Sequence, residues 1–302
     1  NLLVQAPQLL ELYMNNNLLA AMTKVPDNND LIVIENKVEA LSIFLLSDLS
    51  QFPEQENALL AEVFQNYFIK TKFDHIKVLS IKLFKHALAS STQIFVFLSQ
   101  KEFLDEMIAI FQNYRSKRLC RHALHLLINL IDIDEKYVQF IVQSDLIFHI
   151  SSVMHVNEDR CSSLVLDLLQ LCCVKGGIEI VSYDHSHFLC FENKGYTAKK
   201  RFVSFFFTMC SLNDGYLESF EIDHLTTIIN IIDDVMQSND DTLYRQVIHF
   251  YLSHDQSLFA QCILPFLIEN FEFCEFLQDA HETSDEIEMM FQRMNQLHEA
   301  DE

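Results

Sequence analysis

The chain has 302 residues, a formal net charge of −22 and 50% hydrophobic residues, among them 26 Phe. This apolar content excludes intrinsic disorder over most of the length, and 4 Gly and 4 Pro are too few for a sandwich, barrel or doubly wound sheet of this size. An all-helical protein is expected. No apolar run reaches the roughly 18 residues that a membrane span requires.

Cysteine usage predicts a reducing compartment. Eight cysteines are spread along the chain, mostly within apolar helical runs, and none forms a Cys-x-x-Cys pair. Such residues are typical of the reduced core of an intracellular protein. We therefore expect a cytoplasmic location, with a nuclear or a cytoskeletal or ciliary one as alternatives.

Apolar residues at helical spacing predict one long helix that recurs along the chain, at roughly 36–47, 77–89, 118–131, 160–174, 200–212 and 242–253. The clearest unit, about 133–174, contains two shorter helices, a polar break and a long third helix. The sequence VMHVNED from Val153 is echoed by VMQSNDD from Val235, two periods of about 41 residues later. The pattern predicts a single domain over 1–302, built from stacked three-helix units of about 42 residues.

Two segments depart from this period. Residues 175–199 have a poorer helical pattern and contain three of the four glycines, so a shortened or irregular unit with an exposed loop is expected. Residues 269–302 are rich in acidic side chains, and Arg293 is their single Lys or Arg. This end is predicted to be an acidic cap with an amphipathic helix over 284–298, in which Ser284 is the N-cap.

Charge reverses sign in one part of the chain. Residues 70–121 contain ten Lys and Arg against four acidic residues, whereas both flanks are acidic. One interpretation is an ordinary solvated face, and the other is a docking site for an acidic or phosphorylated peptide. Nucleic acid is not expected as a ligand, because the strongly negative chain as a whole would repel a phosphate backbone.

The segment RHALHLLINL, residues 121–130, resembles the third helix of an armadillo repeat, and VQSDLIFHISSVM, residues 142–154, resembles the second helix. The matching positions in the third helix are Ala123, Leu124, Leu127, Asn129 and Leu130. Asp145 and Phe148 stand where the family has Gly and Pro at the opening of the second helix, which implies either a less sharp turn or a unit closer to the related HEAT type. The resemblance implies a right-handed α-solenoid whose third helices line a concave groove.

In this family, Trp and Asn side chains of the third helix contact an extended bound peptide. The Asn position is filled here by His86, Asn129 and Leu171, and the Trp position by Lys82, His125 and Asp167. The chain has no Trp, so the family's clamp for basic signals is not expected. The groove candidates, taken together with the basic segment, are Lys82, Lys85, His86, Arg118, Arg121, His125, Asn129 and Asp167. The alternative is that these are plain solvent-facing positions.

Motifs for chemistry are missing from the sequence. It has no phosphate-binding glycine loop, no nucleophile elbow and no His-Glu-x-x-His, so neither an enzyme nor a cofactor is expected. The weak metal candidates are Cys172, His185, His187 and Cys190. Their spacing is no recognised zinc pairing, and no metal is predicted.

These observations predict a non-enzymatic scaffold or adaptor that binds a peptide or helix of a partner protein along the groove. An acidic or phosphorylated segment is one candidate ligand, and a small molecule is not expected. The alternatives are a structural component of a large cytoskeletal or ciliary assembly, and a solenoid regulator of a kinase or chaperone.

Overall fold

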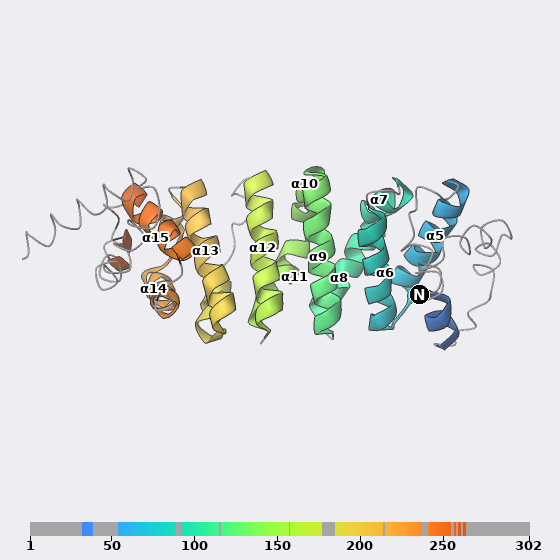
Figure 1. Cartoon of the computed structure of the whole chain (residues 1–302), viewed down its shortest axis with the longest axis horizontal. Coiled ribbons are helices and arrows are strands. Elements are labelled where there is room, and N and C mark those ends of the chain that lie inside the picture. The colour runs from blue at the N-terminus through green and yellow to red at the C-terminus, as the bar shows by residue number, and fades with distance from the viewer. Residues whose placement is uncertain are drawn as a thin grey trace, which may run out of the picture. The chain divides into compact units, whose positions relative to one another are not determined.

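The computed structural model describes residues 32–38, 54–88, 92–114, 116–156, 158–176, 185–213, 215–236, 241–254, 257, 259–260 and 262–263. Every regular element in these ranges is a helix, which confirms the all-helical prediction (Figure 1). None of the described helices is both long enough and apolar enough to cross a bilayer. Most of the predicted helix at 36–47 and the whole acidic segment 269–302, with its predicted helix at 284–298, lie outside the described residues.

The chain divides into two compact units, residues 1–153 and 154–302. In the first unit, α6 packs against α5 and α9, α8 packs against α11, and the short α7 and α10 connect these layers. Its labelled helices are α5 (Glu54–Lys70), α6 (Asp74–Ala87), α7 (Thr92–Leu98), α8 (Lys101–Asn113), α9 (Lys117–Ile133), α10 (Lys136–Val142) and α11 (Leu146–Ser152). The helices predicted at 77–89 and 118–131 are thus α6 and α9, which lie beside each other in Figure 1.

Local sequence explains the bounds of α9. Ser116 is its N-cap, and the Ser116 side chain accepts a hydrogen bond from the Leu119 backbone N–H at 3.2 Å. The preceding helix, α8, ends at Asn113, and its C-cap residue Tyr114 has a left-handed φ of 32° that turns the chain away. Apolar residues then recur at helical spacing through Leu119, Ala123 and Leu130, and all three are buried. The N-cap therefore sets where α9 begins, and the apolar stripe sets which of its faces is buried and which remains at the surface.

An aromatic cluster fills the core of the first unit. Phe68 lies 5.6, 6.5 and 5.7 Å, between ring centroids, from Phe84, Phe97 and Phe103, respectively. All four side chains are buried. They come from four different helices, α5 to α8, so the contacts between their rings pack these four helices together.

In the second unit, α13 is the central helix and packs against α12, α14 and α15. The helices are α12 (Asp159–Gly176), α13 (Tyr196–Leu212), α14 (Ile222–Met236) and α15 (Asp241–His254), with 3-10 helices η4 (His185–Asn193) and η5 (Leu217–Ser219). Another short 3-10 helix, η2 (Val153–His155), stands where the two units meet in sequence. The helices predicted at 160–174, 200–212 and 242–253 correspond to α12, α13 and α15.

Within the predicted irregular unit at 175–199, residues 185–193 form the 3-10 helix η4, and residues 177–184 lie outside the described part of the chain. Phe188 and Phe191 of this helix are buried, because a spacing of three places both on one face of a helix with three residues per turn. Phe191 stacks on Phe202 of α13, with ring centroids 5.0 Å apart. The Phe side chains at 202, 205, 206 and 207 of α13 are all buried and belong to the core.

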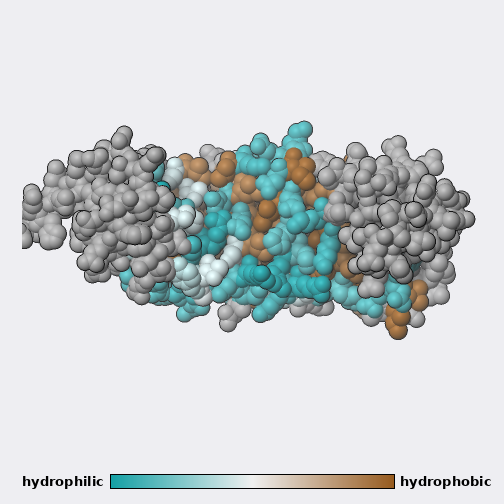
Figure 2. All heavy atoms as spheres, in the orientation of Figure 1, coloured by the Kyte–Doolittle hydropathy of each residue, from teal (hydrophilic) through white to brown (hydrophobic). Residues whose placement is uncertain are grey.

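Figure 2 shows one face of the molecule, on which hydrophilic residues cover most of the coloured surface and hydrophobic ones are interspersed. Exposed large hydrophobic side chains of the described residues include Ile133, Phe148, Val174 and Ile222, on four different helices. Exposed apolar side chains that occur singly are normal for a folded protein. Hydrophobic exposure therefore does not single out a docking surface, and charge is the more informative property.

Candidate functional site

Polar residues follow one face of α9. Arg118, Arg121, His122, His125 and Asn129 recur at spacings of three and four, so they share a stripe about 100° wide. Arg118 and His125 are exposed, and the other three are half-buried. The opposite face carries the buried Leu and Ala residues of the core. The stripe is therefore the surface that α9 presents after it has packed.

Helix α6 adds two lysines to this surface. Lys82 and Lys85 are exposed and one turn apart on α6, which packs against α9. The charge of Lys82 acts on the imidazole of His122, so the two helices bring these side chains near each other. We call Lys82, Lys85, Arg118, Arg121, His122 and His125 the basic surface.

The pKa of His122 reflects the charges of the basic surface. The pKa of His122 is lowered from 6.5 to about 4, first by burial and then by Lys82, Arg118, His125 and Arg121. Every one of these causes disfavours the protonated ring, and no carboxylate acts against them. His122 is therefore neutral at pH 7, and the nearby cations add to the effect of burial.

Four cations of the basic surface, Lys82, Lys85, Arg118 and Arg121, form no ion pair with any residue that the structure describes. Several exposed cations outside it, such as Lys136, Arg160 and Arg245, are likewise unpaired there, whereas others are paired. The pairs found elsewhere are Lys77 with Glu106, Lys199 with Asp234 and Arg201 with Asp167. The charges of the basic surface are thus left for an external anion.

The start of α9 adds to the positive charge of the basic surface. Its first turn contains Lys117 and Arg118 and no acidic residue, whereas α6, α12 and α14 carry Asp74, Asp159 and Asp223 there. Because the N-terminal end of a helix is itself positive, each cation placed there costs about 0.3–1 kcal/mol. A bound anion would relieve this repulsion.

The structure brings some of the predicted groove residues together and not others. Lys82, Arg118, Arg121 and His125 come together, Lys85 lies on the next turn of α6, and Asn129 extends the stripe of α9. The side chain of His86 lies outside the described residues. His122 was not among the residues predicted from the sequence, although its spacing from Arg118 and His125 places it on the same stripe.

Asp167 is in the other unit and belongs to a different arrangement. Its carboxylate accepts a hydrogen bond from Nε of Arg201, and Nη2 of Arg201 also donates to Oε1 of Gln170 at 2.6 Å. Arg201 is on α13, while Asp167 and Gln170 are on α12. The Asp167 carboxylate thus joins two packed helices.

The weak metal candidates have other partners. Cys190 Sγ donates to the backbone oxygen of Met154 at 3.3 Å, and His187 Nδ1 lies 2.5 Å from His155 Nε2. Burial raises the pKa of Cys172 to about 12, which disfavours the thiolate that a metal requires. The side chain of His185 is not described. No group of three or more possible metal ligands occurs among the described residues.

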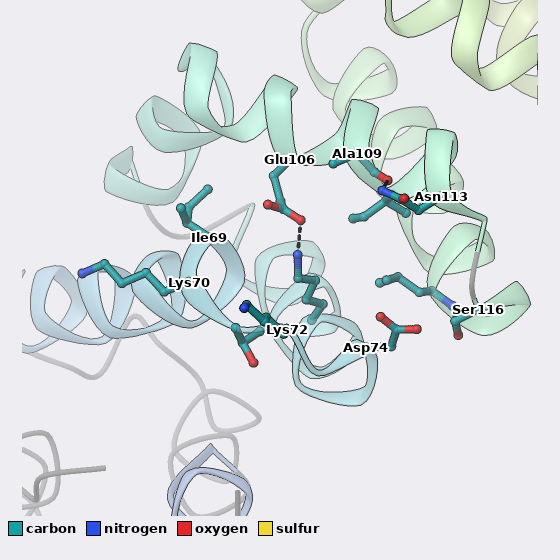
Figure 3. A pocket seen from close by; sticks show the side chains of 12 residues that line it. Ile69, Lys70, Lys72, Asp74, Glu106, Ala109, Asn113 and Ser116 are labelled. Atoms are coloured by element: carbon teal, nitrogen blue, oxygen red, sulfur yellow. Dashed lines mark hydrogen bonds and ion pairs between the residues drawn. The ribbon is translucent and has the colours of Figure 1, made fainter. Parts of the chain in front are cut away.

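A cleft of about 350 Å³ opens near the starts of α6 and α9. Glu106 extends into it and pairs with Lys77, and Asp74 also lies on its wall (Figure 3). Lys77 is buried, and its ammonium is 5.9 Å from the centre of the Phe68 ring. The cleft is lined by Lys70, Lys72 and Lys77 and also by the carboxylates of Asp74 and Glu106, so it is not a purely basic site.

Comparison of the chain with protein-family models and with curated proteins found no match.

Proposed function

We propose that this protein is a non-enzymatic scaffold or adaptor whose basic surface docks an acidic segment of a partner protein. One observation carries the proposal: cations from two helices surround His122, and no carboxylate offsets them in the lowering of its pKa. Such a concentration of like charge is unfavourable in the free protein and becomes favourable when an acidic ligand binds.

The recurring helices support a role in binding. The long helices α6, α9, α12, α13 and α15 begin at residues 74, 117, 159, 196 and 241. We propose that they are the third helices of successive armadillo- or HEAT-like repeats, which would line the binding groove of a solenoid. The basic surface lies on two of them, α6 and α9, and would form one part of that groove.

The basic surface would set recognition more than total affinity. Exposed charge pairs contribute about 0–1 kcal/mol each, so they mainly raise the association rate and the salt dependence. Tighter binding requires apolar contacts as well. Ile133, which is 53% exposed, lies about three turns beyond His122 on α9 and could receive an apolar side chain of the same partner segment.

Charge reversal tests the proposal. The triple variant Lys82→Glu/Arg118→Glu/Arg121→Glu is compared with Lys136→Glu/Arg160→Glu/Arg245→Glu, which reverses three exposed cations outside the basic surface. Both variants change the net charge equally. The probe is a fluorescent peptide rich in Asp and Glu, and its binding is followed by fluorescence anisotropy at about 50 and 150 mM salt.

We expect the first variant to lose at least about tenfold in affinity and most of the salt dependence, and the second to retain both. Equal losses in the two variants would show a response to net charge alone and would overturn the proposal. Circular dichroism of both variants checks that the helices are intact.

A further inference from the structure

We propose that the basic surface recognises a phosphorylated side chain of the partner segment, seated over His122 between Lys82 of α6 and Arg118 and Arg121 of α9. This inference rests on the proposed function and names the group that the surface binds.

The first argument is a match of charge and hydrogen-bonding capacity. A carboxylate brings one negative charge and two oxygens, whereas a phosphorylated side chain brings about −1.5 to −2 charges and three acceptor oxygens. Around His122 the surface offers two guanidinium groups and one ammonium, each with several N–H donors. A single carboxylate would leave most of these donors and charges without a partner, and a phosphate would engage them.

The second argument concerns the types of residue and their setting. Two arginines lie one turn apart, at Arg118 and Arg121, and a guanidinium can bind two phosphate oxygens at once. Arg121 and His122 are half-buried, so the floor of the site is partly removed from water. Charge-assisted hydrogen bonds gain strength in such a setting, which favours the more highly charged ligand.

The third argument is that His122 can change its charge when the ligand arrives. In the free protein its pKa is about 4, so the ring is neutral. The charged groups that lower this pKa are Lys82 on α6 and Arg118, Arg121 and His125 on α9; none comes from α8 or α10, which also pack against α9. A phosphate dianion would reverse the sign of the potential, raise the pKa and allow His122 to take up a proton and donate to the phosphate.

This coupling predicts a pH dependence with a definite sign. Binding raises the pKa of His122, so affinity should increase as the pH falls from about 8 to about 6.5, where the phosphate is still mainly a dianion. A carboxylate peptide, with one charge, should show a weaker effect. Proton uptake on binding is measurable by calorimetry in buffers of different ionisation enthalpy.

The experiment uses three peptides that differ at one central residue, which is phosphoserine, glutamate or serine, within the same mildly acidic flanks. Affinities for the full chain are measured by anisotropy, and the His122 ring is followed by NMR as each peptide is added. We expect the phosphoserine peptide to bind at least about tenfold more tightly than the glutamate peptide and to raise the pKa of His122. The variant Arg118→Lys/Arg121→Lys, which keeps the charge, should lose most of this preference.

Each result decides something. Equal affinity of the phosphoserine and glutamate peptides overturns this inference and leaves the proposed function standing, whereas no binding of either peptide overturns both. Phosphoserine binding that leaves the NMR signal of His122 unchanged overturns the assigned position. An RNA oligonucleotide that binds as tightly as the phosphopeptide shows a general response to phosphate backbones and likewise overturns the inference.

Discussion

Lys82 on α6 and His122 on α9 lie close enough for the ammonium charge to lower the pKa of the imidazole, although 40 positions separate them in the sequence. This relationship exists because α6 and α9 pack against each other. It joins the basic residues of two helices into one surface, and it can be measured directly.

Neutralising Lys82 should raise the pKa of His122. In Lys82→Gln the pKa is expected to rise from about 4 toward 6.5 without reaching it, because burial is the largest cause of the lowering and persists. A pH titration of the His122 ring by NMR measures the change. Lys85→Gln is the matched control, since Lys85 is exposed on the same helix and is not among the causes. An equal rise in the control would refute the close approach of Lys82.

His122 should also make the fold less stable in acid. Its pKa is about 4 in the folded protein and near 6.5 in the unfolded chain, so the unfolded state binds more protons between these values. Its contribution is therefore complete above pH 6.5 and is lost as the pH falls toward 4. We expect His122→Gln to lose less stability than the natural protein over this interval, as measured by urea unfolding at several pH values. Parallel pH profiles for the two proteins would contradict the lowered pKa.

Local patterns in the sequence predict the described helices well, and tertiary relationships poorly. The helix predicted at 118–131 is observed at Lys117–Ile133, because the apolar stripe determines its face and Ser116 its start. In contrast, the pairing of Asp167 with Arg201 spans 34 positions and leaves no local pattern. The closeness of Lys82 to His122 is likewise tertiary, because it depends on the packing of α6 against α9, whereas the place of His122 on the stripe of α9 follows from its spacing.

The secondary structure of residues 185–193 could not be predicted from the local sequence pattern either. The spacing of three between Phe188 and Phe191 fits an α-helix as well as a 3-10 helix, so two residues alone do not distinguish these forms. The spacing suits a 3-10 helix, and the burial of both rings against α13 stabilises that form. The candidate site is affected as well, since His187 was expected in an exposed loop and instead lies against His155.

A side chain at Gly195 should displace the carboxylate of Asp159. Its backbone N–H donates to Oδ2 of Asp159 at 3.1 Å, and a Cβ added at Gly195 would lie 2.4 Å from that oxygen. Gly195→Ala would push the Asp159 carboxylate away, break this hydrogen bond and move a negative charge from the start of α12. We expect a loss of about 1–2 kcal/mol in the free energy of unfolding, measured with urea.

Two controls accompany this prediction. At Gly215 an added Cβ would meet only Oδ1 of Asn213, at 3.4 Å, so Gly215→Ala should have a much smaller effect. In an Asp159→Ala background the clash is absent, and Gly195→Ala should become nearly neutral. If Gly195→Ala costs the same in both backgrounds, the contact with Asp159 is not the cause.

The ion pair between Lys77 and Glu106 should be costly to break from one side. The two side chains are 11% and 17% exposed, and Lys77 also lies over the ring of Phe68. Glu106→Ala leaves a largely buried ammonium without a partner, for which we expect a loss of about 3–5 kcal/mol. Urea unfolding at neutral pH measures it.

Replacing both partners should be far less harmful than removing one. In Lys77→Met/Glu106→Leu no buried charge remains, and the Met side chain can pack on Phe68 as the lysine stem does. We expect the double variant to be more stable than Glu106→Ala, and its helix content and its affinity for the acidic peptide to match the natural protein. A double variant less stable than Glu106→Ala would mean that the pair contributes net stability to the packing of α6 on α8. Unchanged peptide binding would show that the Lys77–Glu106 pair takes no part in binding at the basic surface. The lysines and arginines of that surface form no ion pair with a carboxylate in the described part of the chain.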